Sequence, residues 1–170
     1  MDQRAFSQDG YIVNQDYTAE LPYGAYASSY NGCGWIAMFN LLKALGMEPD
    51  YGQVYREMCA ILPYEGRMGT PVETMEQYLR EKGIPYDYAE GKERVGEIAG
   101  AYAAGIFRYA EQGDPHYVAF RNEGGGRFRF FNADTSKEMH ICSMERFFRE
   151  HVVRRGLRAL LTKELGGKKA

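Results

Sequence analysis

The strongest hydrophobic pattern in the chain lies within residues 33–45. Apolar side chains recur there at helical spacing and widen into a broad face, at Trp35, Ile36, Met38, Phe39, Leu41, Leu42 and Leu45. The pattern predicts a helix over about 33–45, and Gly46 is a suitable stop. So much apolar surface indicates that this helix is buried at the centre of the fold.

Three further helices are predicted between residues 51 and 104. Residues 51–62 form a second helix with Asp50 as its N-cap. Thr70-Pro71-Val72-Glu73 has the sequence of a capping box with proline at the first helical position, and it predicts a third helix that ends at Gly83. Residues 92–104 have a weaker helical pattern, with alanine and glycine among them.

The second half of the chain has patterns typical of strands. Strands are expected at 106–110, 116–122, 127–133 and 157–162, with a shorter one at 139–142 and a helix over 144–151 capped by Ser143. Residues 10–15 are expected to form a short strand, 17–32 a shaped loop, and 84–88 an extended segment. Helices followed by strands predict an α+β fold, with N-terminal helices packed against an antiparallel β-sheet.

Length and composition fit one domain over residues 1–170. The chain is 45% hydrophobic and 26% charged with a formal net charge of −2, so nothing favours nucleic acid or an anionic membrane as a partner. No apolar run reaches about 18 residues, and the N-terminus lacks the apolar run of a secretory signal. These features predict a cytoplasmic protein.

The three cysteines, Cys33, Cys59 and Cys142, are an odd number and widely spaced. This spacing argues against a disulfide framework and against a zinc site, and no metal or cofactor is expected. Cys59 lies within the second helix and Cys142 ends a short strand, which favours structural burial for both. His140 with Cys142 would supply only two ligands, too few to close a zinc site.

Cys33 has a setting suited to chemistry. It stands where the loop Tyr30-Asn31-Gly32 enters the first predicted helix, and a helix N-terminus supplies partial positive charge and unpaired N–H groups. Both would lower the thiol pKa and favour the nucleophilic thiolate. Gly34 would leave space for a substrate backbone. The alternative is that Cys33 is a small buried apolar residue.

A nucleophilic cysteine needs a base, and the chain has three histidines. His116 opens the strand 116–122, where a rigid strand end can hold an imidazole at a cleft. His140 lies in a polar stretch and His151 ends a helix, and both have ordinary surface explanations. His116 is therefore the predicted base.

Strand geometry suggests the group that orients His116. A three-residue turn over 123–125 would pair Phe120 with Phe128 and His116 with Asn132, and directly opposed residues share a face. The Asn132 amide oxygen could then accept from the imidazole and fix its tautomer. Asp134, two residues on, is the competing partner.

These residues resemble a known group of enzymes. Asn31-Gly32-Cys33-Gly34 at the start of an apolar helix, with the order Cys, His, Asn, is similar to papain-like cysteine peptidases. The resemblance is closest to the C39 and C39-like peptidases, the bacteriocin leader-processing type, as a stand-alone domain. Supporting segments are Gly69-Thr70-Pro71, His116-Tyr117-Val118-Ala119-Phe120, Asn132-Ala133-Asp134 and Met144-Glu145-Arg146-Phe147.

Three departures from that pattern matter. The family usually has aspartate at the position that Asn132 occupies. Papain-like enzymes carry an oxyanion-hole glutamine six residues before the cysteine, but Ala27 is found there. Asn31 is the predicted substitute donor. Trp35 stands where the family has a smaller residue, and it could narrow the cleft.

The resemblance implies a papain-like fold and a thiol-dependent peptidase or amide hydrolase acting on peptide or protein substrates. Cys33 would attack, His116 would carry the proton and Asn132 would orient it. Tyr30, Gly34 and Trp35 would line the cleft. Two alternatives stay open: an acyltransferase or transglutaminase-like enzyme on the same fold, or a catalytically weak peptide-binding module. Oligomeric state and substrate are not predicted.

Overall fold

The computed structural model describes residues 1–111, 114–134, 140–151, 153 and 156–165. Helices dominate the first half of the chain and strands the second, so the predicted α+β order is confirmed. Among the described residues, no helix combines the length and apolarity needed to cross a membrane. The helices are α1 (Ser28–Asn31), α2 (Cys33–Ala44), α3 (Tyr51–Ile61), α4 (Val72–Glu81), α5 (Lys92–Ile98) and α6 (Met144–Glu150).

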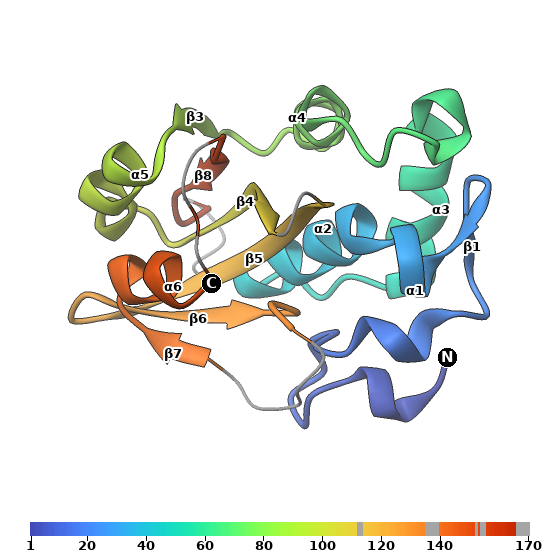
Figure 1. Cartoon of the computed structure of the whole chain (residues 1–170), viewed down its shortest axis with the longest axis horizontal. Coiled ribbons are helices and arrows are strands. Elements are labelled where there is room, and N and C mark those ends of the chain that lie inside the picture. The colour runs from blue at the N-terminus through green and yellow to red at the C-terminus, as the bar shows by residue number, and fades with distance from the viewer. Residues whose placement is uncertain (112–113, 135–139, 152, 154–155, 166–170) are drawn as a thin grey trace.

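The strands form one antiparallel sheet of six in the order β3-β8-β4-β5-β6-β7. A separate small hairpin, β1 with β2, precedes α1. Figure 1 shows α3 towards one end of the molecule, α5 and α6 towards the other, and α2 between them. The strands are β1 (Pro22–Tyr23), β2 (Tyr26–Ala27), β3 (Asp87–Glu90), β4 (Ala104–Glu111), β5 (Asp114–Gly124), β6 (Arg127–Phe131), β7 (His140–Cys142) and β8 (Arg158–Thr162).

Strand β5 divides the interior into two cores because successive side chains point to opposite faces. Tyr117 and Ala119 belong to the core built around α2. Val118 and Phe120 belong to the second core, which contains Phe147 of α6. Every residue of α2 from Gly34 to Leu42 is buried, which confirms the predicted central helix.

The predicted register of the β5–β6 hairpin is wrong by two residues. Phe120 pairs with Phe130 instead of Phe128, and Gly124 pairs with Arg127 across a turn made by Gly125 and Gly126. Both turn glycines have positive φ, which a two-residue hairpin turn requires. An even shift leaves the same residues on the same face. It also means that position 134, and not 132, lies opposite 116 when the register is extended.

Helix caps give mixed outcomes. Asp50 caps α3 and Ser143 caps α6, as predicted, through hydrogen bonds from Gln53 N–H and Arg146 N–H, each 3.1 Å. The predicted capping box at Thr70 is wrong: α4 begins at Val72 with Pro71 as N-cap and no side-chain cap, because the Thr70 hydroxyl bonds elsewhere.

Segments expected to be simple strand or loop also differ in the structure. The strand predicted for 10–15 is only a single bridge between Phe6 and Ile12, followed by a 3-10 turn over Gln15–Thr18. The expected helix over 92–104 ends at Ile98, and β4 begins at Ala104. The expected loop over 17–32 contains the β1–β2 hairpin and α1. The strand expected over 139–142 is β7, and its first position, 139, lies outside the described residues.

Asn40 in the middle of α2 ties the N-terminal segment to the core. Its side chain is fully buried, and it exchanges two hydrogen bonds of 2.9 Å with the backbone N–H and carbonyl of Ile12. The Asn40 amide thus satisfies the backbone N–H and carbonyl of Ile12, as a neighbouring strand would. The position of the following residues, Asn14 and Gln15, depends on this anchor.

We expect Asn40→Leu to lower the free energy of unfolding by about 2–4 kcal/mol, because both backbone groups of Ile12 would lose their partners inside the core. Asn122→Leu is the matched control. The Asn122 amide also makes several hydrogen bonds, to Gly100, Tyr102 and Gly124, but water can replace them at its partly exposed site. Urea denaturation of both variants measures the difference, and equal losses would contradict the anchoring role.

Candidate active site

The predicted nucleophile lies at the start of the central helix. Cys33 is the first residue of α2, Gly32 is its N-cap, and the backbone hydrogen bond from Ile36 N–H to the Gly32 carbonyl opens the helix. The N–H groups of a helix's first turn have no intrahelical acceptor. The Cys33 side chain is half-buried, so the thiol is both partly accessible and close to these groups.

The structure brings the predicted base to this thiol. His116 on β5 and Cys33 line one cavity of about 490 Å³, together with Gln15, Tyr30, Asn132 and Asp134. The cysteine and the histidine are 83 positions apart in sequence (116 minus 33), so the fold and not local structure makes the pair. Among the described residues there is no group of three potential metal-ligating side chains.

The hydrogen bonding of His116 defines which ring nitrogen can act as a base. Its Nε2 lies 2.7 Å from the main-chain carbonyl oxygen of Asn132. A carbonyl only accepts, so the neutral ring carries its hydrogen on Nε2 in this contact and keeps its lone pair on Nδ1. Nδ1 is therefore the atom able to take the thiol proton.

The surroundings of Cys33 favour its thiolate. Burial by itself would raise the pKa of the thiol, but hydrogen bonding to His116 and the positive charge that its ring carries once protonated outweigh burial and hold the pKa below its ordinary value. The Tyr117 backbone and the Arg108 charge act in the same direction. The other two thiols differ, because burial raises the pKa of both Cys59 and Cys142.

Asn132 contacts His116 through its main chain, whereas the sequence predicted a contact through its side chain. The residue has φ +60°, a left-handed conformation that asparagine tolerates better than most residues. Its side chain faces Gln15: Oδ1 accepts from the Gln15 N–H at 3.2 Å, and Nδ2 donates to Gln15 Oε1 at 3.0 Å. Asp134, the competing partner, is exposed and lines the same cavity.

Gln15 lines the cavity of Cys33 and His116 but was not among the site residues predicted from the sequence. It precedes Cys33 by 18 positions (33 minus 15), whereas the spacing typical of papain-like enzymes points to Ala27. The inserted hairpin and α1 lengthen the loop, so a fixed spacing fails. The available signal was a glutamine shortly after the apolar pair Ile12-Val13, ahead of the nucleophile loop. The Gln15 amide also donates to the carbonyls of Ser28 at 3.0 Å and Ser29 at 3.3 Å.

Asn31, the predicted oxyanion donor, uses its amide to join two loops. Nδ2 donates to the Gly66 carbonyl at 2.9 Å and to the Tyr23 carbonyl at 3.3 Å. Asn31 does not line the cavity shared by Cys33 and His116, although it lines a neighbouring one that also reaches Cys33. These bonds give it a structural role in the cleft wall.

Two of the three predicted cleft residues are buried away from the cleft. Trp35 is fully buried, donates from Nε1 to Ser28 Oγ at 2.9 Å and contacts Tyr55 edge-on. Gly34 faces Thr70 so closely that a Cβ atom there would lie 2.4 Å from Thr70 Oγ1. The expectation of a narrowed cleft and an open glycine is therefore corrected: both residues serve packing. Tyr30 does line the cleft and is 75% exposed.

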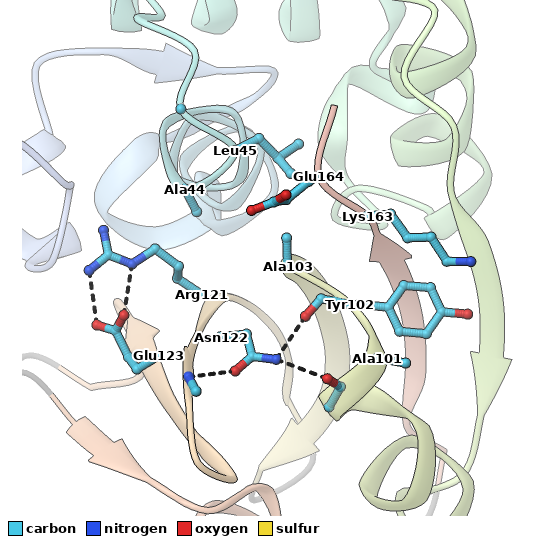
Figure 2. Close-up of a pocket in the computed structure, with 13 residues that line it drawn as sticks. Ala44, Leu45, Ala101, Tyr102, Ala103, Arg121, Asn122, Glu123, Lys163 and Glu164 are labelled. Carbon is cyan, nitrogen blue, oxygen red and sulfur yellow. Dashed lines mark hydrogen bonds and ion pairs between the residues drawn. The ribbon is translucent and has the colours of Figure 1, made fainter. Parts of the chain in front are cut away.

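A hollow larger than the one beside Cys33 and His116 lies apart from the thiol. It measures about 840 Å³ and is lined by residues of the β5–β6 turn, the end of α2 and the segments around 100–103 and 163–164. Figure 2 shows that Arg121 pairs with Glu123 in its wall and that the Asn122 amide binds neighbouring backbone. Its lining contains no cysteine or histidine, so it offers no nucleophile.

Comparison with known proteins supports the fold. No family model matches the chain, and no curated protein matches its sequence. Among solved structures, the fold is similar to the peptidase domain of Streptococcus ComA, a bi-functional ABC transporter involved in quorum sensing, with a TM-score of 0.57. The match covers 79% of this chain and 93% of that domain at 14% identity. The expected α+β fold is therefore confirmed as one shared with a peptidase domain of this kind.

The thiol environment predicts selective alkylation. At mildly acid pH only a thiol with a lowered pKa is appreciably ionised, so iodoacetamide should modify Cys33 well before Cys59 or Cys142. His116→Ala removes the largest favourable interaction, so the pH midpoint of Cys33 alkylation should move upward. Mass spectrometry of each cysteine against pH measures both, and an unchanged midpoint in His116→Ala would contradict the pairing.

Proposed function

We propose that this protein is a thiol-dependent peptidase in which Cys33 is the nucleophile and His116 the general base. The observation that carries the proposal is the shared cavity of these two residues, in which His116 lowers the pKa of the half-buried thiol. Perturbed titration at a cleft is typical of catalytic groups. The papain-like fold, with the cysteine at a helix start and the histidine on a strand, supports the same assignment.

In this mechanism the thiol proton passes to His116 Nδ1 as sulfur attacks the substrate carbonyl carbon. The imidazolium then donates that proton to the leaving amine, which departs and leaves a thioester on Cys33. Water, deprotonated by the same nitrogen, hydrolyses the thioester and restores the thiol. The Asn132 carbonyl holds Nε2–H throughout, so the ring presents the same nitrogen at each step.

The oxyanion formed in attack needs donors close to the sulfur. The Cys33 N–H at the helix start is one, and we assign the Gln15 amide as the second. Gln15 lines the cavity with Cys33 and His116. The Asn132 amide donates to Gln15 Oε1, so the amide hydrogens of Gln15 point away from Asn132. Those hydrogens now bond to the carbonyls of Ser28 and Ser29, and one of them would turn to the oxyanion.

The central test is Cys33-dependent cleavage of a peptide mixture, read as new N-termini by mass spectrometry. Cys33→Ala should abolish cleavage, because no other group supplies the nucleophile, whereas Cys59→Ala should retain it. Added hydroxylamine separates hydrolysis from acyl transfer: an acyltransferase would form hydroxamates in preference to acids. Cleavage that persists in Cys33→Ala, or none in the unmodified protein, would refute the proposal.

The oxyanion assignment is tested by comparing Gln15→Ala with Asn31→Ala. Loss of an oxyanion donor costs about 10²–10³ in kcat with little change in KM. Gln15→Ala should show that loss with its Cys33 alkylation midpoint unchanged. Asn31→Ala should chiefly lower the melting temperature, because it frees two loops. The reverse result would return the oxyanion role to Asn31.

A further inference from the structure

Cys33 also opens onto a second cavity, of about 450 Å³, which does not include His116 in its lining. Its walls come from β2, α1, the segment 67–70 and the ends of β4 and β5. Arg67, Arg108, Tyr30 and Met68 supply its positive charge and its apolar surface. The thiol therefore lies between two cavities, one with the histidine and one without it.

The chemistry of peptide cleavage assigns a part of the substrate to each cavity. The leaving amine must receive its proton from His116, so the leaving portion lies in the cavity that contains His116. The acyl portion stays bonded to Cys33 after the amine has left. It must extend to the other side of the sulfur, into the second cavity.

The second cavity contains an arginine without a partner of its own. Arg108 on β4 is half-buried, and no hydrogen bond or ion pair joins its guanidinium to any residue that the structure describes. Directly opposite on β8 lies Arg158, whose guanidinium is engaged by Tyr88 at 2.8 Å and Glu73 at 3.4 Å. Like charges opposite one another destabilise a sheet, and the nearby Glu73 carboxylate, whose pKa the Arg108 charge helps to lower, is bonded to Arg158 and not to Arg108.

Other charges in the cavity leave Arg108 able to bind a ligand. Asp114 is an exposed carboxylate on the rim, but it makes no ion pair with Arg108. Arg67 adds a second positive charge and contacts Glu65 only at 3.7 Å on the surface, where such pairs are weak. A planar guanidinium that lacks a carboxylate is suited to bind one from a substrate.

The apolar part of the cavity wall is held in place by interlocking loops. The Ala25 N–H donates to the Glu65 carbonyl at 2.7 Å, and a Cβ on Gly24 would lie 2.0 Å from that oxygen. Glu65 and the preceding residue both have φ +54°, an unfavourable conformation that this packing maintains. The wall presents Tyr30 and Met68, which are 75% and 73% exposed. Exposed apolar side chains beside a thiol are suited to contact a substrate side chain.

We propose that the second cavity selects peptide substrates with an acidic side chain in the acyl portion near the scissile bond, bound by Arg108, and an apolar side chain packed on Tyr30 and Met68. The inference rests on the proposed function, because the acyl side is defined by attack of Cys33. It adds a substrate class that the catalytic pair alone does not define.

The test uses peptidyl chloromethyl ketones, whose reactive carbon fixes the register at Cys33. Pairs of reagents carry Glu or Gln at each of the second, third and fourth residues before that carbon. At the best position, Glu should raise the rate constant of Cys33 alkylation about tenfold over Gln, as expected for one partly exposed charged hydrogen bond. The preference should shrink as salt rises.

Arg108→Gln should abolish the Glu preference and Arg108→Glu should reverse it in favour of Lys. Arg108→Lys keeps the charge and should keep part of the preference. Arg94→Gln, which removes the same charge from the exposed surface of α5, should behave as the unmodified protein. A Glu preference that survives in Arg108→Gln, or its absence in the unmodified protein, would overturn the inference.

A second measurement separates this inference from the proposed function. Fluorescence anisotropy of the same sequences, as labelled peptide amides bound to Cys33→Ala, requires no catalysis. Cys33-dependent cleavage without a Glu preference in either measurement would refute the acidic specificity and leave the peptidase standing. A Glu preference that depends on Arg108, without any cleavage, would refute the peptidase and leave acidic peptide recognition by this cavity.

Discussion

The packing of Thr70 between α2 and β5 is the contact on which the candidate site depends. Thr70 fills the space beside Gly34, its carbonyl accepts from the Tyr117 hydroxyl at 2.6 Å, and its own hydroxyl meets Tyr23 Oη at 3.0 Å. Gly34 follows the nucleophile and Tyr117 follows the base. One buried threonine therefore fixes the residues that follow Cys33 and His116, the proposed catalytic pair, and so helps to hold the two side chains together.

The N-terminal segment completes the site from the other side. Asn40 binds Ile12 in the core, and three residues later Gln15 binds Asn132 through both its backbone and its side chain. The Asn132 carbonyl in turn holds His116. A chain of hydrogen bonds thus connects the central helix to the imidazole, and each polar group named in it has a partner. Rigidity of this kind preserves catalytic geometry better than a free loop would.

The two cavities beside Cys33 differ in their electrostatics. On the His116 side, hydrogen bonding and the imidazole charge lower the pKa of the thiol against the effect of burial. On the opposite side, Arg108 and Arg67 supply positive charge beside exposed Tyr30 and Met68. The same Arg108 that would bind an acidic substrate also favours the thiolate, so substrate recognition and nucleophile activation share a residue.

The sequence and the tertiary structure determined different parts of this protein. The apolar spacing of residues 35–42 required a buried helix, and Cys33 at its start was recognisable as a candidate nucleophile. Asp50 and Ser143 were correct caps because their partners lie three residues away. His116 was predicted from its place at the start of an expected strand, although β5 begins two residues earlier, at Asp114. Only the tertiary structure decided the contacts between distant segments. Thr70 had the sequence of a helix cap, but Tyr23, 47 positions away, competes for its hydroxyl. The glycine run after residue 123 allowed more than one turn, and Gln15 reaches the site across an inserted hairpin. Such contacts depend on three-dimensional proximity, which no spacing in the sequence encodes.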